Sequence, residues 1–206
     1  MKAHAPTVFV VDDDGAVRSS LRLLLKSVGL AVSAFDSAQA FLDAYSQLWA
    51  GCILLDVRMP DMSGPVLQQQ LTLRGSRLPV IFITGHGDVS MAVEAMQKGA
   101  FDFVEKPFHD QELLDRVHRA LAEDARIRCQ LAEHETIRNR FDSLTPRERE
   151  VLEQVTRGSS NKVMAYDLRI SQRTIEIHRS RIMEKMQAPS LAQLVRMTRS
   201  MTTSGG

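Results

Sequence analysis

The chain has 206 residues, of which 44% are hydrophobic and 25% charged, and this balance is typical of a globular protein with one or two domains. No apolar run approaches the length of a membrane span, and residues 8–11 run straight into three aspartates, so we expect neither a membrane helix nor a signal peptide. The two cysteines lie far apart and no Cys/His cluster has zinc-ligand spacing, which argues against a disulfide framework or a zinc site and predicts a cytoplasmic protein.

The net charge of +1 is unevenly distributed along the chain. Residues 1–122 carry 11 Lys and Arg against 14 Asp and Glu, a balance of −3. Residues 123–140 carry 4 of each sign, whereas residues 141–206 carry 11 basic against 7 acidic residues, a balance of +4. An acidic front half and a modestly basic tail suggest that only the tail binds a polyanion.

Short apolar runs alternate with amphipathic segments in the first half of the chain. Five runs are predicted to be buried strands, at residues 8–11, 31–35, 52–55, 80–84 and 101–105. Between and after them we expect a helix at residues 16–28, one that Ser37 caps and that reaches Leu48, one with Pro65 in its first turn, one at residues 89–98 and one from Gln111 onward. These strand–helix units predict an α/β domain with a doubly wound, five-stranded parallel sheet.

Polar residues follow the predicted strands at points that such a fold brings together. They are Asp12 and Asp13 after the first strand, Asp56 after the third, Thr84 at the end of the fourth and Lys106 after the fifth. Doubly wound sheets carry their functional groups beyond the carboxyl ends of the strands, so these side chains are expected to form one site. A single acidic residue at a strand end is more often a solvated loop residue, but that reading does not explain the whole ordered set.

This set of residues suits phosphoryl transfer. Neighbouring carboxylates repel one another unless a cation joins them, and Mg²⁺ binds one or two carboxylates while it keeps several waters. Asp56 is placed as a nucleophile whose attack on a phosphoryl donor gives an acyl phosphate, and the metal, Lys106 and the Thr84 hydroxyl can neutralise the transferred oxygens. The enzymatic alternative is a Mg²⁺-dependent phosphatase, but such enzymes often carry a second Asp two residues later, where this chain has Arg58.

The helical pattern that begins at Gln111 continues to about Arg140 without Pro or Gly. Its apolar residues thin out along the way, so residues 123–140 are predicted to be a helical linker between domains at 1–122 and 141–206. Whether the linker helix pairs with a second copy or stands in solvent is left open, because its heptad pattern is weak. The last domain is predicted to be all-α, with four helices at residues 146–157, 161–168, 172–186 and 191–200.

The second and third of these helices form a helix-turn-helix pattern, in which Ser171 caps the third helix. On that helix the residues expected to face a core are Ile175, Ile182 and Met186, and the opposite stripe holds Arg173, Glu176, Ile177, Ser180 and Glu184. This mixed stripe suits a major groove, where Glu accepts from cytosine and an aliphatic side chain meets a thymine methyl. The side chains within reach of phosphates are Lys162, Arg173, Arg179 and Arg181. A plain helical bundle accounts for the periodicity equally well.

Four segments of the first half resemble the receiver domain of two-component response regulators, most closely those of the FixJ type. They are VVDDD at residues 10–14, DVRMPDMSG at 56–64, TGHGD at 84–88 and FVEKPF at 103–108. The resemblance implies that Asp56 accepts a phosphoryl group from a sensor histidine kinase. It also implies that Asp13, Asp56 and the Arg58 carbonyl hold Mg²⁺ with help from Asp12, that Thr84 and Lys106 bind the phosphoryl group, and that Phe103 is the switch aromatic. In that family the Lys106–Pro107 peptide bond is cis.

The tail is similar to LuxR/NarL-type helix-turn-helix domains, through LTPREREVL at residues 144–152, NK at 161–162 and SQRTIEIH at 171–178. Carried over by position, Glu176, Ile177 and Ser180 would face base edges, and Thr174 would touch the DNA backbone. His178 would either touch the backbone or serve the structure.

The two resemblances together imply a phosphorylation-controlled transcription regulator rather than an enzyme, with slow hydrolysis of its own phospho-Asp56. The implied partners are a sensor histidine kinase, double-stranded DNA, RNA polymerase and, after phosphorylation, a second copy of the chain, with no membrane association. The FixJ likeness suggests nitrogen-fixation or microaerobic genes as targets. A DNA-binding or interaction module that ignores phosphorylation remains the alternative.

Overall fold

The computed structural model of the chain describes residues 5–85, 93, 94 and 96–202. These residues form two compact units that meet at Arg128 and Cys129, and each is described by itself below. None of the described helices is both long and apolar enough to cross a membrane.

The first unit contains a five-stranded sheet in which all strands run parallel. Its strands are β1 (Thr7–Val11), β2 (Ala31–Phe35), β3 (Gly51–Asp56), β4 (Val80–Thr84) and β5 (Asp102–Glu105). They lie in the order β2-β1-β3-β4-β5, so β2 is on one side of β1 and the later strands follow one another on its other side. Each predicted strand is present within one residue of its expected bounds, and the prediction of a doubly wound parallel sheet is confirmed.

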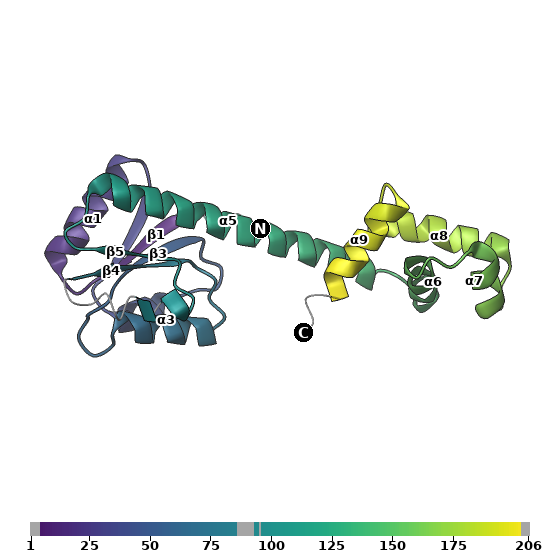
Figure 1. Ribbon diagram of the computed structural model, residues 1–206, viewed down its shortest axis with the longest axis horizontal. Helices are drawn as coiled ribbons and strands as arrows, with labels where there is room; N and C mark the ends of the chain where they lie inside the picture. Colours follow the sequence, from purple (N-terminus) through teal and green to yellow (C-terminus); the bar gives the residue numbers. More distant parts are fainter. Residues whose placement is uncertain (1–4, 86–92, 95, 203–206) are drawn as a thin grey trace. The chain divides into compact units, whose positions relative to one another are not determined.

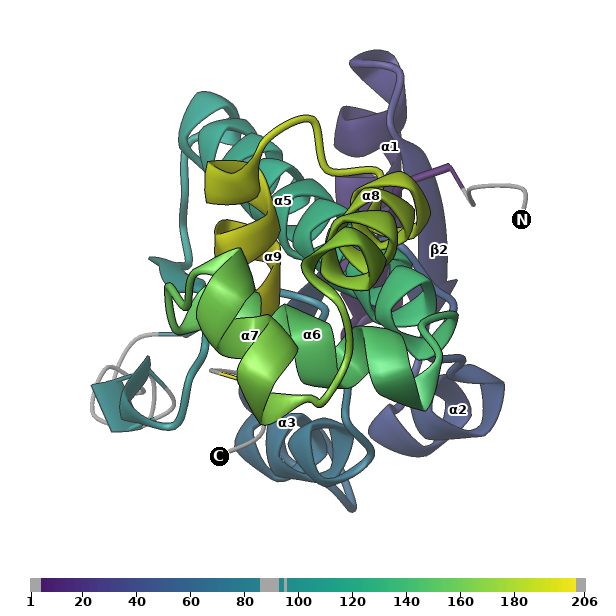
Figure 2. The same cartoon turned by 90° about the vertical axis from the view of Figure 1, so that its right-hand side faces the viewer.

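Helices cover both faces of this sheet. One face carries α1 (Gly15–Ser27) and α5 (Asp110–Asp142), and the other carries α2 (Ala38–Ala44) and α3 (Gly64–Leu73) (Figures 1 and 2). The strands are buried on both sides, and alternate residues along them feed two separate cores. Val8, Val10, Leu54 and Ile83 pack against α1 and α5, whereas their neighbours on the opposite face pack against α2 and α3. This two-sided burial explains why the strands read as continuous apolar runs.

Two predicted helices differ from expectation or cannot be compared. The helix that Ser37 caps ends at Ala44 instead of reaching Leu48, because the backbone turns at Tyr45. The turn lets Trp49 stack on Phe9, with ring centroids 4.3 Å apart, so aromatic packing overrides the helical pattern. Half of the helix predicted at residues 89–98, namely residues 89–92 and 95, lies outside the described residues, and residues 93, 94, 96 and 97 are helical.

Helix α5 is continuous from Asp110 to Asp142, as the absence of Pro and Gly predicted. The two units divide within the segment 123–140 that the sequence suggested as a linker, and both parts of that segment are helical. The second unit adds α6 (Pro146–Thr156), α7 (Asn161–Asp167), α8 (Gln172–Met186) and α9 (Leu191–Thr202). They enclose one core with the end of α5, which includes Ile137, Leu152, Met164, Ile182 and Leu194.

Candidate functional site

The first candidate site lies at the carboxyl ends of β1 and β3, where the strand order reverses. Asp12 directly follows β1, and Asp56 is the last residue of β3. Lys106, just beyond β5, places its Nζ atom 2.8 Å from Asp56 Oδ1 and 3.1 Å from Asp12 Oδ2. Three residues that are far apart in the sequence thus form one charged cluster, at the edge where ligands bind in open α/β sheets.

Burial sets the electrostatics of this cluster. Asp12 is 1% exposed and Asp56 is 8% exposed. Burial raises the pKa of Asp56, and the hydrogen bond from Lys106 opposes this effect. Burial by itself acts to lower the pKa of Lys106, but its hydrogen bonds to the two carboxylates outweigh burial and the pKa is raised. One ammonium between two carboxylates leaves a net negative charge, which favours a further cation.

The backbone around Asp56 holds its carboxylate in place. Oδ2 accepts a hydrogen bond from the Arg58 backbone N–H at 2.7 Å, so one oxygen faces the loop and the other faces Lys106. Gly64 begins α3 against this loop, and a Cβ atom there would lie 2.3 Å from the Asp56 carbonyl oxygen. Only glycine allows α3 to approach this closely, which fixes the loop that follows Asp56.

Thr84 and Phe103 lie on the neighbouring strands β4 and β5. Thr84 is fully buried, and its hydroxyl oxygen has no hydrogen-bond partner among the residues that the structure describes. Its carbonyl oxygen accepts from the Lys106 backbone N–H at 2.7 Å, so its backbone is tied to the cluster while its hydroxyl is left for another acceptor. Phe103 is half-buried and packs against the core on the α2 and α3 side.

The donors around the cluster fit Mg²⁺. Asp12 and Asp56 supply two carboxylates, and Asp13, next in the chain, is exposed. In the described part of the chain, no three His, Cys, Asp or Glu side chains converge to form a metal site by themselves. Magnesium is ordinarily held by one or two carboxylates together with waters, so the arrangement suits it better than a metal that needs a complete cage of side chains.

Sequence reasoning missed the residues that position Asp12. The Asp14 backbone N–H donates to Asp12 Oδ1 at 2.8 Å, and Arg18 donates to the Asp12 carbonyl oxygen at 2.8 Å. Asp14 also accepts from the Ala16 N–H at 2.7 Å and so caps α1. The third aspartate of the acidic run therefore serves as a helix cap, a role that its place just before a helical segment could have indicated. The Lys106–Pro107 peptide bond is cis, as the family resemblance implied.

The second candidate site is the exposed side of α8. The stripe predicted from the sequence is present: Arg173, Glu176, Ile177, Ser180 and Glu184 are all exposed, and Ile177 is 46% exposed. The residues expected to face the core, Ile175, Ile182 and Met186, are buried. An exposed isoleucine among charged and hydroxyl side chains is unusual for a surface that meets only water, and it suits a groove that offers thymine methyl groups.

Two residues predicted to contact DNA also have partners inside the helix-turn-helix. Arg179 is half-buried and donates to the Asn161 side chain at 2.8 Å, a hydrogen bond that joins α8 to the start of α7. Thr174 is half-buried as well, and its N–H donates to the hydroxyl of the cap residue Ser171 at 3.0 Å. Lys162 and Arg181 are exposed, with their charges at the surface. The Arg179–Asn161 bond gives Arg179 a structural task that helical periodicity does not reveal.

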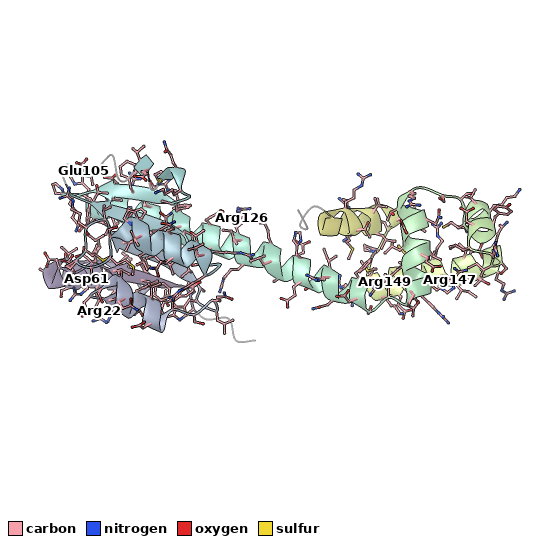
Figure 3. All side chains as sticks on the ribbon, turned by 90° about the horizontal axis from the view of Figure 1, so that it is seen from below. Arg22, Asp61, Glu105, Arg126, Arg147 and Arg149 are labelled. Atoms are coloured by element: carbon pink, nitrogen blue, oxygen red, sulfur yellow. The ribbon has the colours of Figure 1, made fainter. Side chains whose placement is uncertain are left out.

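A buried ion pair braces α8 against α6. Glu148 is 2% exposed, and its carboxylate lies 2.7 Å from Lys185 Nζ. The same carboxylate accepts from the Thr145 N–H at 2.8 Å, and so closes a capping box at the start of α6. Arg147, which Figure 3 shows on α6 together with Arg149, donates to the Leu168 carbonyl at the end of α7. Helix α6 is therefore bonded to both helices of the helix-turn-helix, α7 and α8.

We expect Glu148→Gln to lower the stability of the second unit by about 1–2 kcal/mol, because a buried ion pair is broken although Lys185 is partly solvated. Burial alone would raise the pKa of Glu148, but the hydrogen bonds from Lys185 and Thr145 outweigh it and lower the pKa. A lowered pKa stabilises the fold above the ordinary value of 4.5, and this contribution is lost as pH falls below it. Native-state hydrogen exchange of peptides from residues 141–198 in the full chain measures the effect.

Glu153→Gln is the matched control, since Glu153 is exposed and pairs with Arg157 one helical turn away. It should change protection very little. Equal effects of the two substitutions, or an acid-induced loss of protection that persists unchanged in Glu148→Gln, would contradict the account of the ion pair.

Comparisons with known proteins match both units. The family model described as "Response regulator receiver domain" matches residues 8–118, and the model described as "Bacterial regulatory proteins, luxR family" matches residues 142–198. The chain is 50% identical over 190 residues to the transcriptional regulatory protein FixJ of Azorhizobium caulinodans, covering 92% of this chain and 90% of that protein. It is 42% identical over 204 residues to the response regulator protein TodT of Pseudomonas putida, covering 99% of this chain and 90% of that protein.

Solved structures agree with this match. The response regulator StyR superposes with a TM-score of 0.88 at 45% identity, covering 96% of this chain and 100% of that one. Full-length FixJ from B. japonicum superposes with a TM-score of 0.59 at 44% identity, covering 96% and 98%. The two matched families, the sheet with its acidic cluster and the helix-turn-helix unit together show that the chain belongs to the two-component response regulators of the FixJ type, which join a receiver domain to a LuxR-type DNA-binding domain.

Proposed function

We propose that phosphorylation of Asp56 by a sensor histidine kinase controls how this transcription regulator binds DNA. The observation that carries the proposal is the geometry of Asp56. Its carboxylate is held between Lys106 and the Arg58 N–H, and Thr84, the last residue of the neighbouring strand β4, has a buried hydroxyl without a hydrogen-bond partner among the described residues. A carboxylate, an ammonium group and a hydroxyl at the same edge of the sheet are the groups that phosphoryl transfer to a carboxylate needs.

In this proposal each group has a separate task. Asp12, Asp13, Asp56 and the Arg58 carbonyl would hold Mg²⁺, which would supply positive charge to neutralise the incoming phosphoryl group. Asp56 Oδ1 attacks phosphorus, and the donor's leaving group departs with the electron pair of the broken bond. Lys106 then pairs with a phosphoryl oxygen in place of the Asp56 carboxylate, and the Thr84 hydroxyl donates to another. Slow attack by water on the phosphorus of phospho-Asp56 breaks its bond to the aspartyl oxygen, releases inorganic phosphate and restores the Asp56 carboxylate.

Strands β4 and β5 carry the effect of phosphorylation from Asp56 to the surface of the receiver. Movement of Thr84 toward the phosphoryl group opens space that Phe103, which is half-buried on the adjacent strand, can fill. The surface around residues 89–98 and 101–105, of which residues 89–92 and 95 lie outside the described residues, then pairs two receivers. Residues 123–140 connect each receiver to its tail. Pairing brings two DNA-binding domains together and raises their effective concentration without a new base contact.

On DNA, α8 enters the major groove of each half-site. Glu176, Ile177 and Ser180 read base edges, and phosphates are contacted by Lys162, Arg173, Thr174 and Arg179. The DNA-binding domain also contacts RNA polymerase. The protein acts in the cytoplasm, where the DNA and the kinase are found. The likeness to FixJ proteins supports nitrogen-fixation or microaerobic genes as targets.

The test is sedimentation of the full chain with acetyl phosphate and Mg²⁺. We expect a monomer without phosphodonor and a dimer with it, and no dimer when Mg²⁺ is withheld. If intact-mass analysis shows phosphoryl incorporation while the sedimentation coefficient stays unchanged, dimerisation is not the switch. An oligomeric state and DNA affinity that both ignore phosphodonor would favour the phosphorylation-independent module.

A further inference from the structure

A cavity of about 340 Å³ lies in the receiver domain at the amino-terminal edge of β4, the opposite edge from Asp56. Helix α3, the loop before β4, the segment before β5 and helix α5 line it. Its volume is at the lower end of the range typical of sites for small organic molecules. None of the residues assigned to phosphoryl transfer lines it.

Gln68 on α3 contributes a polar side chain to the wall of this cavity. The residue is only 5% exposed and lines the cavity, yet its side-chain amide makes no hydrogen bond with any residue in the described part of the chain. Its backbone carbonyl is satisfied by the Thr72 hydroxyl at 3.0 Å, so only the amide group lacks a partner. Neither atom of the amide is among the fully buried side-chain atoms that lack a partner, so both can form hydrogen bonds with a ligand or with water in the cavity.

One acidic and one basic side chain line the cavity, and only the acidic one has an ion-pair partner among the described residues. Glu123 on α5 lines it, but Arg126, one turn further along the helix (Figure 3), binds both oxygens of Glu123 at 2.6 and 2.8 Å. Arg77, in the loop before β4, also lines the cavity and forms no ion pair with a residue that the structure describes. The carboxylate of Glu123 is therefore paired within α5, whereas Arg77 is exposed to solvent and its guanidinium can pair with an anion.

The remaining walls of the cavity are mainly apolar. Leu71, Val80, Phe101 and Ile127 contribute aliphatic and aromatic surface from α3, β4, the segment before β5 and α5. Such walls favour a ligand with an apolar body and disfavour a fully hydrated ion such as free phosphate. A planar guanidinium matches the two oxygens of a carboxylate, and an amide NH₂ supplies a further donor.

We propose that this cavity is a binding site for a small carboxylate with an aromatic or branched aliphatic body. The carboxylate pairs with the guanidinium of Arg77 and accepts a hydrogen bond from the Gln68 amide, while the apolar body rests against Leu71, Phe101 and Ile127. The site is independent of phosphorylation, because its residues lie at the other edge of the sheet. Bound ligand joins α3 to α5, and it raises the stability of the receiver with the logarithm of the ligand concentration once that exceeds the dissociation constant.

Benzoate is the probe, added to the unphosphorylated full chain, and the readouts are the ¹⁵N and ¹H shifts of the Gln68 side-chain amide and the thermal unfolding of the receiver. We expect saturable shifts and a rise in melting temperature. Affinity should fall about tenfold or more in Gln68→Met, which keeps the volume, and in Arg77→Gln, which removes the charge. Benzamide, which has the same ring without the charge, should bind about tenfold more weakly than benzoate.

Arg22→Gln is the control, since Arg22 is an exposed arginine on α1 that does not line the cavity (Figure 3). It should leave benzoate binding unchanged. The proposal is overturned if benzoate produces no saturable shift, in which case water satisfies Gln68. It is also overturned if Arg77→Gln and Arg22→Gln bind benzoate equally well, or if benzamide binds as tightly as benzoate. None of these outcomes depends on whether Asp56 accepts a phosphoryl group.

Discussion

Replacement of Asp56 by Asn is expected to abolish phosphoryl incorporation from acetyl phosphate, and with it the phosphodonor-dependent gain in DNA binding. The amide has nearly the same shape but is not a nucleophile, and Lys106 keeps its second partner, Asp12, at 3.1 Å. The substitution also removes a buried carboxylate whose pKa is raised by burial, so the fold should not be weakened. Intact-mass spectrometry and DNA titrations in the same buffer measure the two losses.

Asp61→Asn is the matched control for this prediction. Asp61 lies in the same loop, is exposed and has a φ of 64°, a conformation that Asn tolerates. It should accept one phosphoryl group as the unchanged chain does. Incorporation that persists in Asp56→Asn but disappears in Asp61→Asn would move the phosphoacceptor to Asp61 and contradict the site described above.

Replacement of Glu176 by Ala should reduce discrimination at one base pair of each half-site by about 1–3 kcal/mol, or roughly 5- to 150-fold in relative affinity. Glu176 is exposed in the first half of α8, where the recognition helix of such motifs meets base edges. Non-specific affinity should rise slightly, because an acidic group near the phosphates is lost. Competition titrations with operators that differ at single positions separate the two effects.

Glu153→Ala controls for the change in charge, since it removes the same charge from an exposed position on α6. It should leave the base preference intact. If Glu176→Ala lowers affinity for every operator by the same factor, Glu176 does not read a base, and α8 meets the DNA in another orientation.

The sequence located the acidic cluster because parallel strands bring their carboxyl ends to one edge of a sheet. Asp12, Asp56 and Lys106 were predicted from that rule alone, and their oxygens and nitrogen lie within about 3 Å of one another in hydrogen-bonded pairs. The continuous helix α5 and the exposed stripe of α8 were also predicted, since both depend on local periodicity.

Features that depend on tertiary packing were not predictable in this way. Asp124 sits in a run of charged residues that reads as a solvated helix face, yet it is 3% exposed. It accepts from the Gly51 N–H at 2.9 Å and pairs with Arg128 at 3.3 Å, which ties α5 to the start of β3. The Arg179–Asn161 bond was missed for the same reason, because neither partner signals the other along the chain.

The most direct test of the central claim is selection of bound fragments from the source genome by the full chain, with and without acetyl phosphate and Mg²⁺, followed by sequencing. Control of DNA binding by phospho-Asp56 predicts strong enrichment of a sequence with two half-sites about one helical turn apart, only when phosphodonor is present, and loss of that enrichment in Asp56→Asn. Equal enrichment in both conditions would contradict the switch while leaving the DNA-binding domain in place.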